Sequence, residues 1–346
     1  MRHQYICMIV TSVLFIFPSC TTETVDIEIP STERNYQWDT ASPSSVGLDS
    51  LRIESSFAVA DSAGFLRSIL VIKDGKAVAE KYYGYVRPES WHDLRSATKS
   101  FTSALVGIAI DKGLLRLNDK IAEILHEAVH AEADSRIYDV TIKDILQMKS
   151  GIGGDFYFEN VESDQQTLIE YIINAPMQAD PGDRFIYSSN SNTLLTAAIA
   201  KVSGKSAKEF ADEFLCEPLG ISISWWEKDI QGNNFGGGGL FLSTRNMAAF
   251  GYLFLNDGNL NGQQIISQNW VRASFNDEAG YGYLWWIGTL NGYKTYSARG
   301  FGGQVILIVP ELNMVVAATC DTEIDLNQAY YQGDFILALI RDYILQ

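Results

Sequence analysis

Hydrophobic positions along the chain predict strands near both ends and helices between them. Residues 69–72 read Ile-Leu-Val-Ile, and Asp74-Gly75 separates them from a second apolar run over 77–82. An Asp-Gly pair between two such runs is typical of a tight β-hairpin. Asn291-Gly292 predicts a second hairpin on the same grounds. Strand character near the C-terminus covers residues 281–287, 293–298, 304–309 and 314–320. The two groups of strands predict one antiparallel sheet built from both chain ends.

Apolar positions with helical spacing occupy most of the remaining chain. The expected helices cover residues 48–63, 96–112, 118–130, 141–148, 193–202, 207–215, 245–255 and 326–345. The helix that contains Lys99 is apolar on nearly all sides, which is typical of burial, and Gly113 offers a left-handed end. We expect an α+β fold in which terminal helices pack on the antiparallel sheet and a mainly helical lobe is inserted. A cleft between the lobes is the expected place for a site.

The N-terminal segment has the composition of an export signal. Arg2 and His3 precede an apolar run from Tyr5 to Phe17, which is too short to span a bilayer, and a cysteine follows at Cys20. The segment resembles a bacterial lipoprotein signal, in which Cys20 would carry the lipid that attaches the protein to a membrane. Ordinary signal cleavage and an uncleaved anchor are the alternatives. An exported bacterial protein, lipidated or soluble in the periplasm, is expected in the first two cases.

These patterns divide the chain into three parts. We expect a lipoprotein-type signal over 1–20, a polar tether over 21–45 and one folded domain over 46–346. The α/β lobe of that domain would comprise about 46–115 and 240–346, and the helical lobe about 116–239.

Composition narrows the range of partners. The 346 residues carry a formal net charge of −16, whereas nucleic-acid binding requires a basic surface, so no nucleic-acid partner is expected. Cys216 and Cys320 are the two cysteines beyond the expected signal, and their separation matches no metal-ligand spacing. We expect them to be buried, and a disulfide between them stays open because export would permit one. The sequence predicts no oligomeric state.

The first candidate for chemistry is Ser96-Ala-Thr-Lys99. Residues three apart on a helix share a face, so the Ser96 hydroxyl and the Lys99 amine can meet. Burial of an ammonium lowers its pKa, which makes a proton-accepting lysine possible beside a serine nucleophile. The alternative is a helix cap followed by a solvated lysine. The chain has four histidines and no Gly-x-Ser-x-Gly, so a Ser-His-Asp triad is not expected.

Two further stretches could complete such a site. Tyr187 is followed by Ser188-Ser-Asn190-Ser-Asn192, which could present a phenol beside the nucleophile or could simply cap a helix. Residues 297–304 read Ser-Ala-Arg-Gly-Phe-Gly-Gly-Gln between two expected strands. Glycines there permit close approach of a substrate and free backbone amides to donate, or they form an ordinary tight turn.

Together these motifs resemble the serine beta-lactamase and penicillin-binding-protein superfamily. The likeness is to its class C-like branch of esterases, D-aminopeptidases and 6-aminohexanoate-oligomer hydrolases, and it extends over roughly residues 47–320. Similar phrases in this chain cover residues 141–151, 236–240, 243–247 and 281–286.

The resemblance implies a serine hydrolase with the fold described above and without a metal or organic cofactor. Ser96 would be acylated, and Lys99 and Tyr187 would act as the acid/base groups. The oxyanion would lie between the backbone amides of Ser96 and Phe301. A small-molecule or short peptide-like ester or amide is the implied substrate, and Tyr187 would protonate its leaving group.

Two departures from the family pattern bear on the substrate. Ser189 stands where beta-lactamases have the asparagine of Tyr-x-Asn, with Asn190 or Asn192 as possible replacements. Ala298-Arg299-Gly300 stands where they have Lys-Thr-Gly, so Arg299 and Gly300 become the expected substrate-binding residues of that strand. Both changes favour an esterase or amidase over a beta-lactam hydrolase. Aromatic residues expected near the cleft are Phe156, Tyr157, Trp285, Trp286 and Phe301.

Two alternatives to a serine hydrolase remain. His126-Glu127-Ala-Val-His130 is a His-Glu-x-x-His sequence, which on a helix would predict a zinc metallopeptidase. The second alternative is a non-catalytic protein that retains the fold and binds peptide or peptidoglycan. Loss of hydrolysis on chelation, with Ser96→Ala unaffected, would favour the metallopeptidase. Failure of the intact protein to react with a fluorophosphonate or to turn over a p-nitrophenyl ester would favour the non-catalytic protein.

Overall fold

The computed structural model describes residues 34–154, 167–276 and 280–345. The expected signal with Cys20, the first part of the expected tether, and Phe156 and Tyr157 lie outside the described residues. Within them, no helix is both long and apolar enough to cross a membrane.

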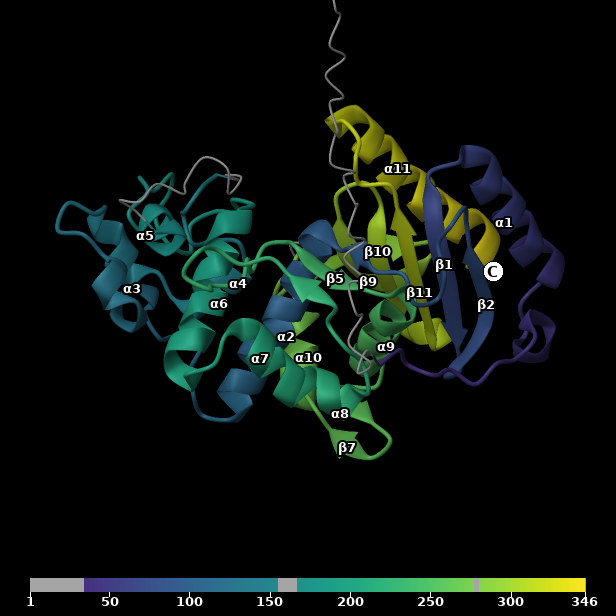
Figure 1. The fold of residues 1–346 in the computed structure, drawn as a ribbon, viewed down its shortest axis with the longest axis horizontal. Helices are drawn as coiled ribbons and strands as arrows, with labels where there is room; N and C mark the ends of the chain where they lie inside the picture. The colour runs from purple at the N-terminus through teal and green to yellow at the C-terminus, as the bar shows by residue number, and fades with distance from the viewer. Residues whose placement is uncertain (1–33, 155–166, 277–279, 346) are drawn as a thin grey trace, which may run out of the picture. The chain divides into compact units, whose positions relative to one another are not determined.

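Strands from both ends of the chain form one six-stranded sheet, as Figure 1 shows. The strand order is β2-β1-β11-β10-β9-β8, and every neighbouring pair is antiparallel. The strands are β1 (Leu66–Lys73), β2 (Lys76–Tyr82), β8 (Trp286–Leu290), β9 (Tyr293–Gly300), β10 (Gln304–Val309) and β11 (Met314–Cys320). Asp74 and Gly75 turn β1 into β2 with φ of 53° and 73°, the left-handed pair that a tight hairpin requires. The predicted sheet from both chain ends is confirmed.

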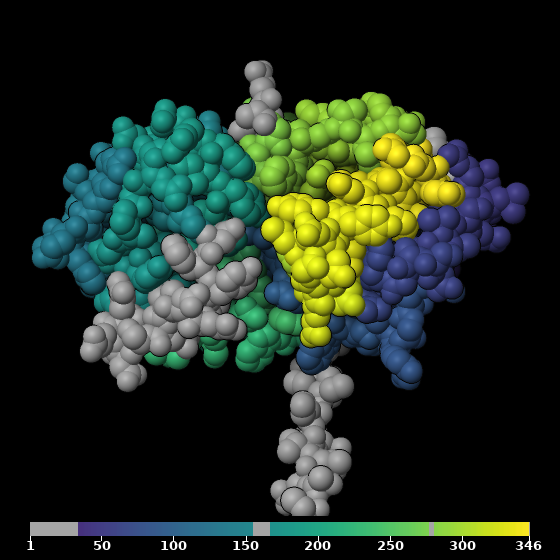
Figure 2. Space-filling view, turned by 90° about the horizontal axis from the view of Figure 1, so that it is seen from above, coloured from purple at the N-terminus to yellow at the C-terminus, as the bar shows by residue number. Residues whose placement is uncertain are grey.

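The two faces of the sheet carry separate hydrophobic cores, because alternate strand residues point to opposite faces. Leu70 and Ile72 of β1 join a core with the central helices, whereas Ile69 and Val71 join a second core with the terminal helices. Helices α1 (Ser50–Ala63) and α11 (Leu326–Leu339) cover that second face and lie side by side (Figures 1 and 2). The continuous apolar runs of β1, β10 and β11 therefore reflect burial on both sides.

Helices cover the first face and form the inserted region. The α-helices here are α2 (Thr98–Asp111), α3 (Ile121–Ile124), α4 (Ile142–Leu146), α5 (Leu168–Ile173), α6 (Ser189–Ser203), α7 (Ala207–Ala211), α8 (Glu217–Leu219), α9 (Thr244–Leu255) and α10 (Gln268–Ser274). Five short 3₁₀ helices of the described residues are η1 (Pro43–Val46), η2 (Arg95–Ala97), η3 (His126–Ala128), η4 (Ser135–Asp139) and η7 (Pro310–Leu312). A π-helical turn follows α7 over Asp212–Cys216, and another follows α11 over Ile340–Ile344. The small strands are β3 (His92–Asp93), β4 (Trp225–Trp226), β5 (Leu240–Leu242), β6 (Asn259–Leu260) and β7 (Gln263–Gln264).

Three expected boundaries were wrong. The helix expected over 118–130 is two short turns, α3 and η3, because Leu125 between them leaves the helical conformation with φ −106° and ψ 34°. Helix α6 begins at Ser189, four residues before the expected start, since Ser188 caps it and its polar first turn is buried. Strand β8 begins at Trp286 rather than at 281, because Leu284 has a φ of 60° and interrupts extended structure.

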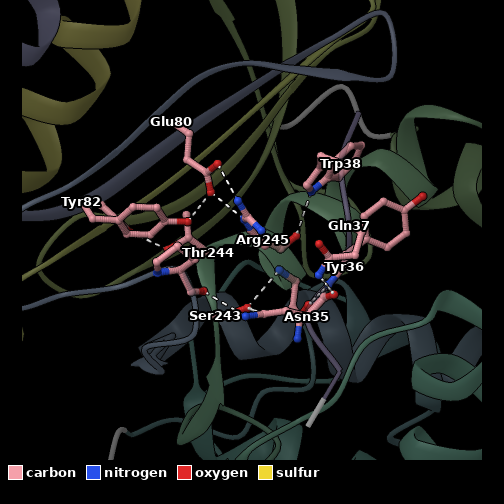
Figure 3. A network of polar contacts seen from close by, with 12 residues as sticks. Asn35, Tyr36, Gln37, Trp38, Glu80, Tyr82, Ser243, Thr244 and Arg245 are labelled. Atoms are coloured by element: carbon pink, nitrogen blue, oxygen red, sulfur yellow. Dashed lines mark hydrogen bonds and ion pairs between the residues drawn. The ribbon is translucent and has the colours of Figure 1, made fainter. Parts of the chain in front are cut away.

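Part of the segment expected to be a tether is bound to the folded domain. The backbone amide of Tyr36 donates to Asn246 Oδ1 at 2.9 Å, and the Asn35 side chain accepts from the Ser243 hydroxyl (Figure 3). Beside them, Arg245 of α9 forms a two-pronged ion pair with Glu80 of β2 at 2.7 and 2.9 Å. These contacts join residues 35–38, the sheet edge and the start of α9 into one polar network.

The predicted fold class is confirmed: an α+β protein with an antiparallel sheet from both chain ends, helices on it and a helical insert. Cys216 and Cys320 are both free and buried, and burial raises the pKa of each thiol. The two lobes share a continuous apolar core that includes residues from α2 and α6.

Candidate active site

Ser96 lies in η2, the tight turn that leads into the buried helix α2. Lys99 lies in the first turn of α2 and is 1% exposed, so its stem and amine are enclosed by protein. The Lys99 Nζ atom is 2.8 Å from Ser96 Oγ. The chain therefore brings the two residues of the Ser-x-x-Lys sequence within hydrogen-bonding distance, and the solvated-lysine alternative is wrong.

Two more oxygen atoms contact the buried amine. Ser189 Oγ, at the start of α6, is 2.9 Å from Lys99 Nζ, and the backbone oxygen of Gly237 is 2.7 Å from it. These oxygens and the Ser96 hydroxyl are uncharged groups, and burial disfavours an ammonium over a neutral amine. The three acceptors hold the amine in place, and its contact with Ser96 Oγ positions Lys99 to exchange a proton with that hydroxyl.

The glycine run over 236–239 is packed between α2 and α6. A Cβ atom at Gly236 would lie 2.2 Å from the backbone oxygen of Asn192, and one at Gly237 would lie 2.4 Å from that of Ser189. Thr102 of α2 donates from Oγ1 to the Gly236 oxygen at 2.8 Å. Only glycine allows the backbone of residues 236–237 to approach α6 this closely. Because of this approach, the Gly237 carbonyl lies in contact with Lys99.

Tyr187 stands on the other side of the amine, immediately before the Ser188 cap of α6. Its ring centroid is 4.8 Å from Lys99 Nζ. The ring stacks on Trp286 with centroids 6.1 Å apart and meets the edge of Tyr281 at 6.5 Å. Burial and the neighbouring Tyr187 raise the pKa of Tyr281, so Tyr281 stays a neutral phenol that fixes the ring. Tyr187 is therefore held among rings beside the Ser96–Lys99 pair.

A cavity of about 470 Å³ opens beside these groups. Ser96 and Tyr187 line one end of it, and residues 299–305 line a second wall formed by the end of β9 and the turn to β10. Helix α11 supplies the remaining wall through Leu326, Ala329, Tyr330, Gly333, Asp334, Ile336 and Leu337. Trp286 and Phe301 line the cavity, whereas Trp285 is buried in the core.

Arg299 is the cationic side chain of the β9 wall. Its Nε donates to Ser297 Oγ at 2.8 Å, and its guanidinium lies 5.9 Å from the centre of the Trp286 ring. Burial lowers the pKa of Arg299, and the charge of Asp334 across the cavity opposes that shift. No ion pair joins Arg299 to an acidic group among the described residues. A half-buried guanidinium without a carboxylate partner is suited to bind an anionic group.

Of the other expected substrate-binding residues, Gly300 lines the cavity, whereas Ser189, Asn190 and Asn192 do not. Gly300 packs against the start of the Ser96 turn, since a Cβ there would lie 2.1 Å from the Leu94 oxygen. Ser189 contacts Lys99 rather than the cavity wall. Asn190 is 1% exposed, and no described residue offers a hydrogen-bond partner to its Oδ1 atom. Asn192 donates to the Ser188 oxygen at 2.7 Å within α6.

Sequence reasoning missed the Gly237 carbonyl and the α11 wall. A backbone oxygen leaves no mark in the sequence, although the four successive glycines were a signal that a backbone comes close there. Asp334 and Tyr330 lie in a helix that was expected to pack only on the sheet. Helical spacing alone does not show that one edge of α11 borders a cavity.

The His126–His130 segment does not form the helix that a zinc site would need. Residues 126–128 make a single turn, and Val129 is extended with φ −88° and ψ 121°. Glu127 pairs with Lys201, and the hydrogen bond from Lys201 lowers the pKa of the Glu127 carboxylate. Among the described residues, no three His, Cys, Asp or Glu side chains are grouped as metal ligands. The metallopeptidase alternative lacks its structural basis.

Comparison with known proteins agrees with this geometry. The family model described as Beta-lactamase matches residues 67–337. The 6-aminohexanoate-dimer hydrolase of Paenarthrobacter ureafaciens is 24% identical over 283 residues, which cover 72% of this chain and 71% of the relative. Protein flp of Staphylococcus aureus (strain MW2) is 27% identical over 165 residues, or 44% of this chain. This chain spans 33% of the length of flp.

Solved structures show the same fold. A putative 6-aminohexanoate-dimer hydrolase from Bacillus anthracis superposes with a TM-score of 0.72 at 19% identity, covering 90% of each chain. EstCE1, a hydrolase with promiscuous acyltransferase activity, superposes with a TM-score of 0.69 at 16% identity, covering 88% of this chain and 99% of its own. The predicted membership of the class C-like branch is confirmed. The family match over most of the chain means that this protein belongs to the beta-lactamase family.

Proposed function

We propose that this protein cleaves an ester or amide through an acyl-enzyme on Ser96, with Lys99 and Tyr187 as its acid/base groups. One observation carries the proposal: the buried Lys99 amine lies 2.8 Å from the Ser96 hydroxyl at the end of an open cavity. A buried amine beside a serine is a standard means of activating a weak nucleophile.

The proposed reaction has two halves. Lys99 Nζ takes the proton of Ser96 Oγ as that oxygen attacks the substrate carbonyl carbon. The oxyanion lies between the backbone amides of Ser96 and Phe301, and both residues border the cavity. The leaving oxygen or nitrogen departs with a proton from Tyr187. Water then attacks the acyl-enzyme and gives its proton to the Tyr187 phenolate. Ser96 Oγ takes back the proton held by Lys99 as the acid is released, so all three groups return to their starting forms.

The substrate is proposed to carry a carboxylate that binds Arg299. Arg299 lines the cavity beside Ser96 without an ion pair among the described residues. Two relatives are named as hydrolases of 6-aminohexanoate dimer, and EstCE1 is named as a hydrolase with acyltransferase activity. These names support linear amides and esters as the first compounds to test, ahead of beta-lactams.

A labelling and turnover panel tests the proposal. Wild type and the variants Ser96→Ala, Lys99→Ala and Tyr187→Phe are treated with a fluorophosphonate and assayed with p-nitrophenyl esters, linear amides, D-amino-acid amides and nitrocefin. We expect wild type to gain one covalent adduct at Ser96 and to turn over esters, with little nitrocefin hydrolysis. Ester turnover should fall by about a thousandfold or more in all three variants.

Ser103→Ala is the matched control. Ser103 lies in the same helix, is buried, and its Oγ has no hydrogen-bond partner among the described residues. Its replacement should leave labelling and turnover unchanged. A wild-type protein that neither labels nor turns over any ester would refute the enzymatic proposal and favour a non-catalytic peptide binder.

Export and lipidation form a separate part of the proposal, which rests on the sequence of residues 1–20. Cys20 is proposed to carry the lipid and to attach the domain to the periplasmic face of a membrane. Metabolic labelling with a palmitate analogue should mark the wild type and not Cys20→Ser. Equal labelling of both proteins would rule out this anchor.

A further inference from the structure

Residue 95, just before the proposed nucleophile, has an unusual backbone conformation. Arg95 has a φ of 48°, in the left-handed region that is unfavourable for residues with a Cβ atom. Strained residues of this kind persist only where their surroundings impose them. The contacts of Arg95 should therefore show what holds this conformation.

The chain is fixed on both sides of Arg95. Before it, Leu94 donates to the Leu240 oxygen at 2.9 Å, and its own oxygen accepts from Ala97 at 3.0 Å. The end of β9 packs on that same oxygen at Gly300. After it, Ser96 Oγ lies 2.8 Å from Lys99 Nζ. Because the flanks are held, Arg95 has to make the left-handed turn that carries the chain from β3 into η2.

Asp93 contacts Arg95 with both carboxylate oxygens. Oδ1 accepts the backbone amide of Arg95 at 2.8 Å, and Oδ2 lies 2.9 Å from the side-chain Nε. An aspartate that accepts the amide two residues later forms a turn that can replace ordinary backbone pairing. Asp93 is itself anchored in β3, where it pairs with Phe241 of β5. The Asp93 side chain, which is carried by a small sheet, thus contacts both the backbone and the side chain of Arg95.

We propose that Asp93 is a positioning residue for the reaction: its carboxylate holds Arg95 in the left-handed conformation and thereby aims Ser96 at Lys99 and the cavity. This inference rests on the proposed function of Ser96. Asp93 does not border the cavity and is not expected to contact substrate. Its loss should lower kcat and leave KM nearly unchanged.

Glycine at position 95 gives a sharp test, because glycine adopts a positive φ without the penalty of a side chain. The substitution Asp93→Ala is made in three proteins: the wild type, the Arg95→Gly variant and the Arg95→Ala variant. Each product is compared with the same protein that retains Asp93. Turnover of a p-nitrophenyl ester gives kcat and KM, and the rate of fluorophosphonate labelling reports the reactivity of Ser96. We expect Asp93→Ala to lower kcat about tenfold in the wild-type background and at most about twofold in the Arg95→Gly background.

The Arg95→Ala background separates two explanations of such a rescue. Alanine removes the guanidinium but keeps the strained φ, so Asp93→Ala should still lower kcat by about fivefold there. Equal rescue by glycine and alanine would mean that Asp93 only neutralises Arg95, and equal losses in all three backgrounds would mean a general structural role. Either result overturns the inference. An inactive wild type would instead refute the proposed function.

Asp93→Asn keeps the series informative if Asp93→Ala fails to fold. Asparagine retains an oxygen for the Arg95 amide but loses the ion pair, so a loss of kcat of about threefold that glycine at 95 removes would support the inference. An unchanged kcat in every background would overturn it.

The charges around Asp93 predict a pH effect. Arg95 of η2 and Glu227, which follows β4, face it, whereas His92 of the same strand points to the opposite face, near Arg67. Burial raises the pKa of Asp93, and burial and Asp93 raise the pKa of Glu227. The charge of Arg95 lowers the pKa of Asp93 and opposes the effect of burial, so Arg95→Ala should move the acid limb of the kcat profile to higher pH. A shift to lower pH, or none, would contradict the requirement for an ionised Asp93.

Discussion

Two walls of the site are built in different ways. The lysine wall, formed by the starts of α2 and α6 and by the glycine run over 236–239, is buried and joined by short polar contacts around Lys99. The cavity wall, formed by the end of β9, the turn to β10 and α11, is half-exposed and carries opposite charges at Arg299 and Asp334 without an ion pair between them. We infer from this difference that Ser96 and Lys99 tolerate little displacement, whereas the side chains of the cavity wall can be substituted with smaller effects.

Among substitutions outside Ser96, Lys99 and Tyr187, the largest expected effect comes from Gly237→Ala on the lysine wall. The added Cβ would lie 2.4 Å from the Ser189 oxygen, so the backbone of 236–239 must move and the Gly237 carbonyl must leave Lys99. We expect kcat to fall about a hundredfold and the free energy of unfolding to drop by about 3 kcal/mol. Steady-state kinetics and thermal unfolding measure both. Unchanged kcat would show that the lysine does not depend on that carbonyl.

Ser189→Ala should have the next largest effect. It removes one oxygen from the buried Lys99 amine, so we expect kcat to fall about tenfold with KM changed by less than about twofold. Kinetics with a neutral ester and with a carboxylate-bearing amide measure the split. A raised KM with normal kcat would instead assign Ser189 to substrate binding, the role that its sequence position suggested.

The cavity wall should respond in KM, and in opposite directions for its two charges. Arg299→Gln should raise KM for a carboxylate-bearing substrate about tenfold, because a charged hydrogen bond is lost. Asp334→Asn should lower the same KM about two- to threefold, since it removes a negative charge that faces Arg299. A neutral ester of similar size is the control, and both variants should leave its KM unchanged. Equal effects on both substrates would exclude a carboxylate subsite.

Gly333→Ala on the cavity wall should have the smallest effect and forms a pair with Gly237→Ala. A Cβ at Gly333 meets no atom within 4 Å, and the residue lies inside α11. We expect the free energy of unfolding to rise by about 0.5–1 kcal/mol, because alanine favours a helix over glycine. Chemical denaturation measures it, and kcat should stay within about twofold of wild type. A loss as large as that of Gly237→Ala would remove the distinction between the walls.

The sequence predicted the sheet and the contact between Ser96 and Lys99 for a physical reason. The hairpin at Asp74-Gly75 and the apolar strands β10 and β11 depend on local conformational preference and burial. Both can be predicted from the residues of one segment alone. The approach of Ser96 to Lys99 follows from helical spacing. Their approach to Tyr187 came from resemblance to a family, since no local rule relates residues ninety positions apart.

The parts that escaped prediction depend on backbone atoms and on packing between distant segments. The Gly237 carbonyl has no side chain to signal it, and the left-handed Arg95 occupies a position where local preference favours another conformation. Two short turns replaced the expected helix of residues 118–130 because Leu125, which is packed in the core, leaves the helical conformation between them. In each case tertiary contacts outweighed local preference.

The pairing of β1 with β11 has a consequence for biosynthesis. The hairpin of β1 and β2 emerges from the ribosome some 240 residues before β11, the strand that pairs with β1. The apolar edge of β1 therefore stays unpaired until almost the whole polypeptide has been made. The helical insert, whose contacts are more local, can form in the meantime. Activity should therefore arise late and all at once, and a nascent chain that ends before β9 should have no labelable serine.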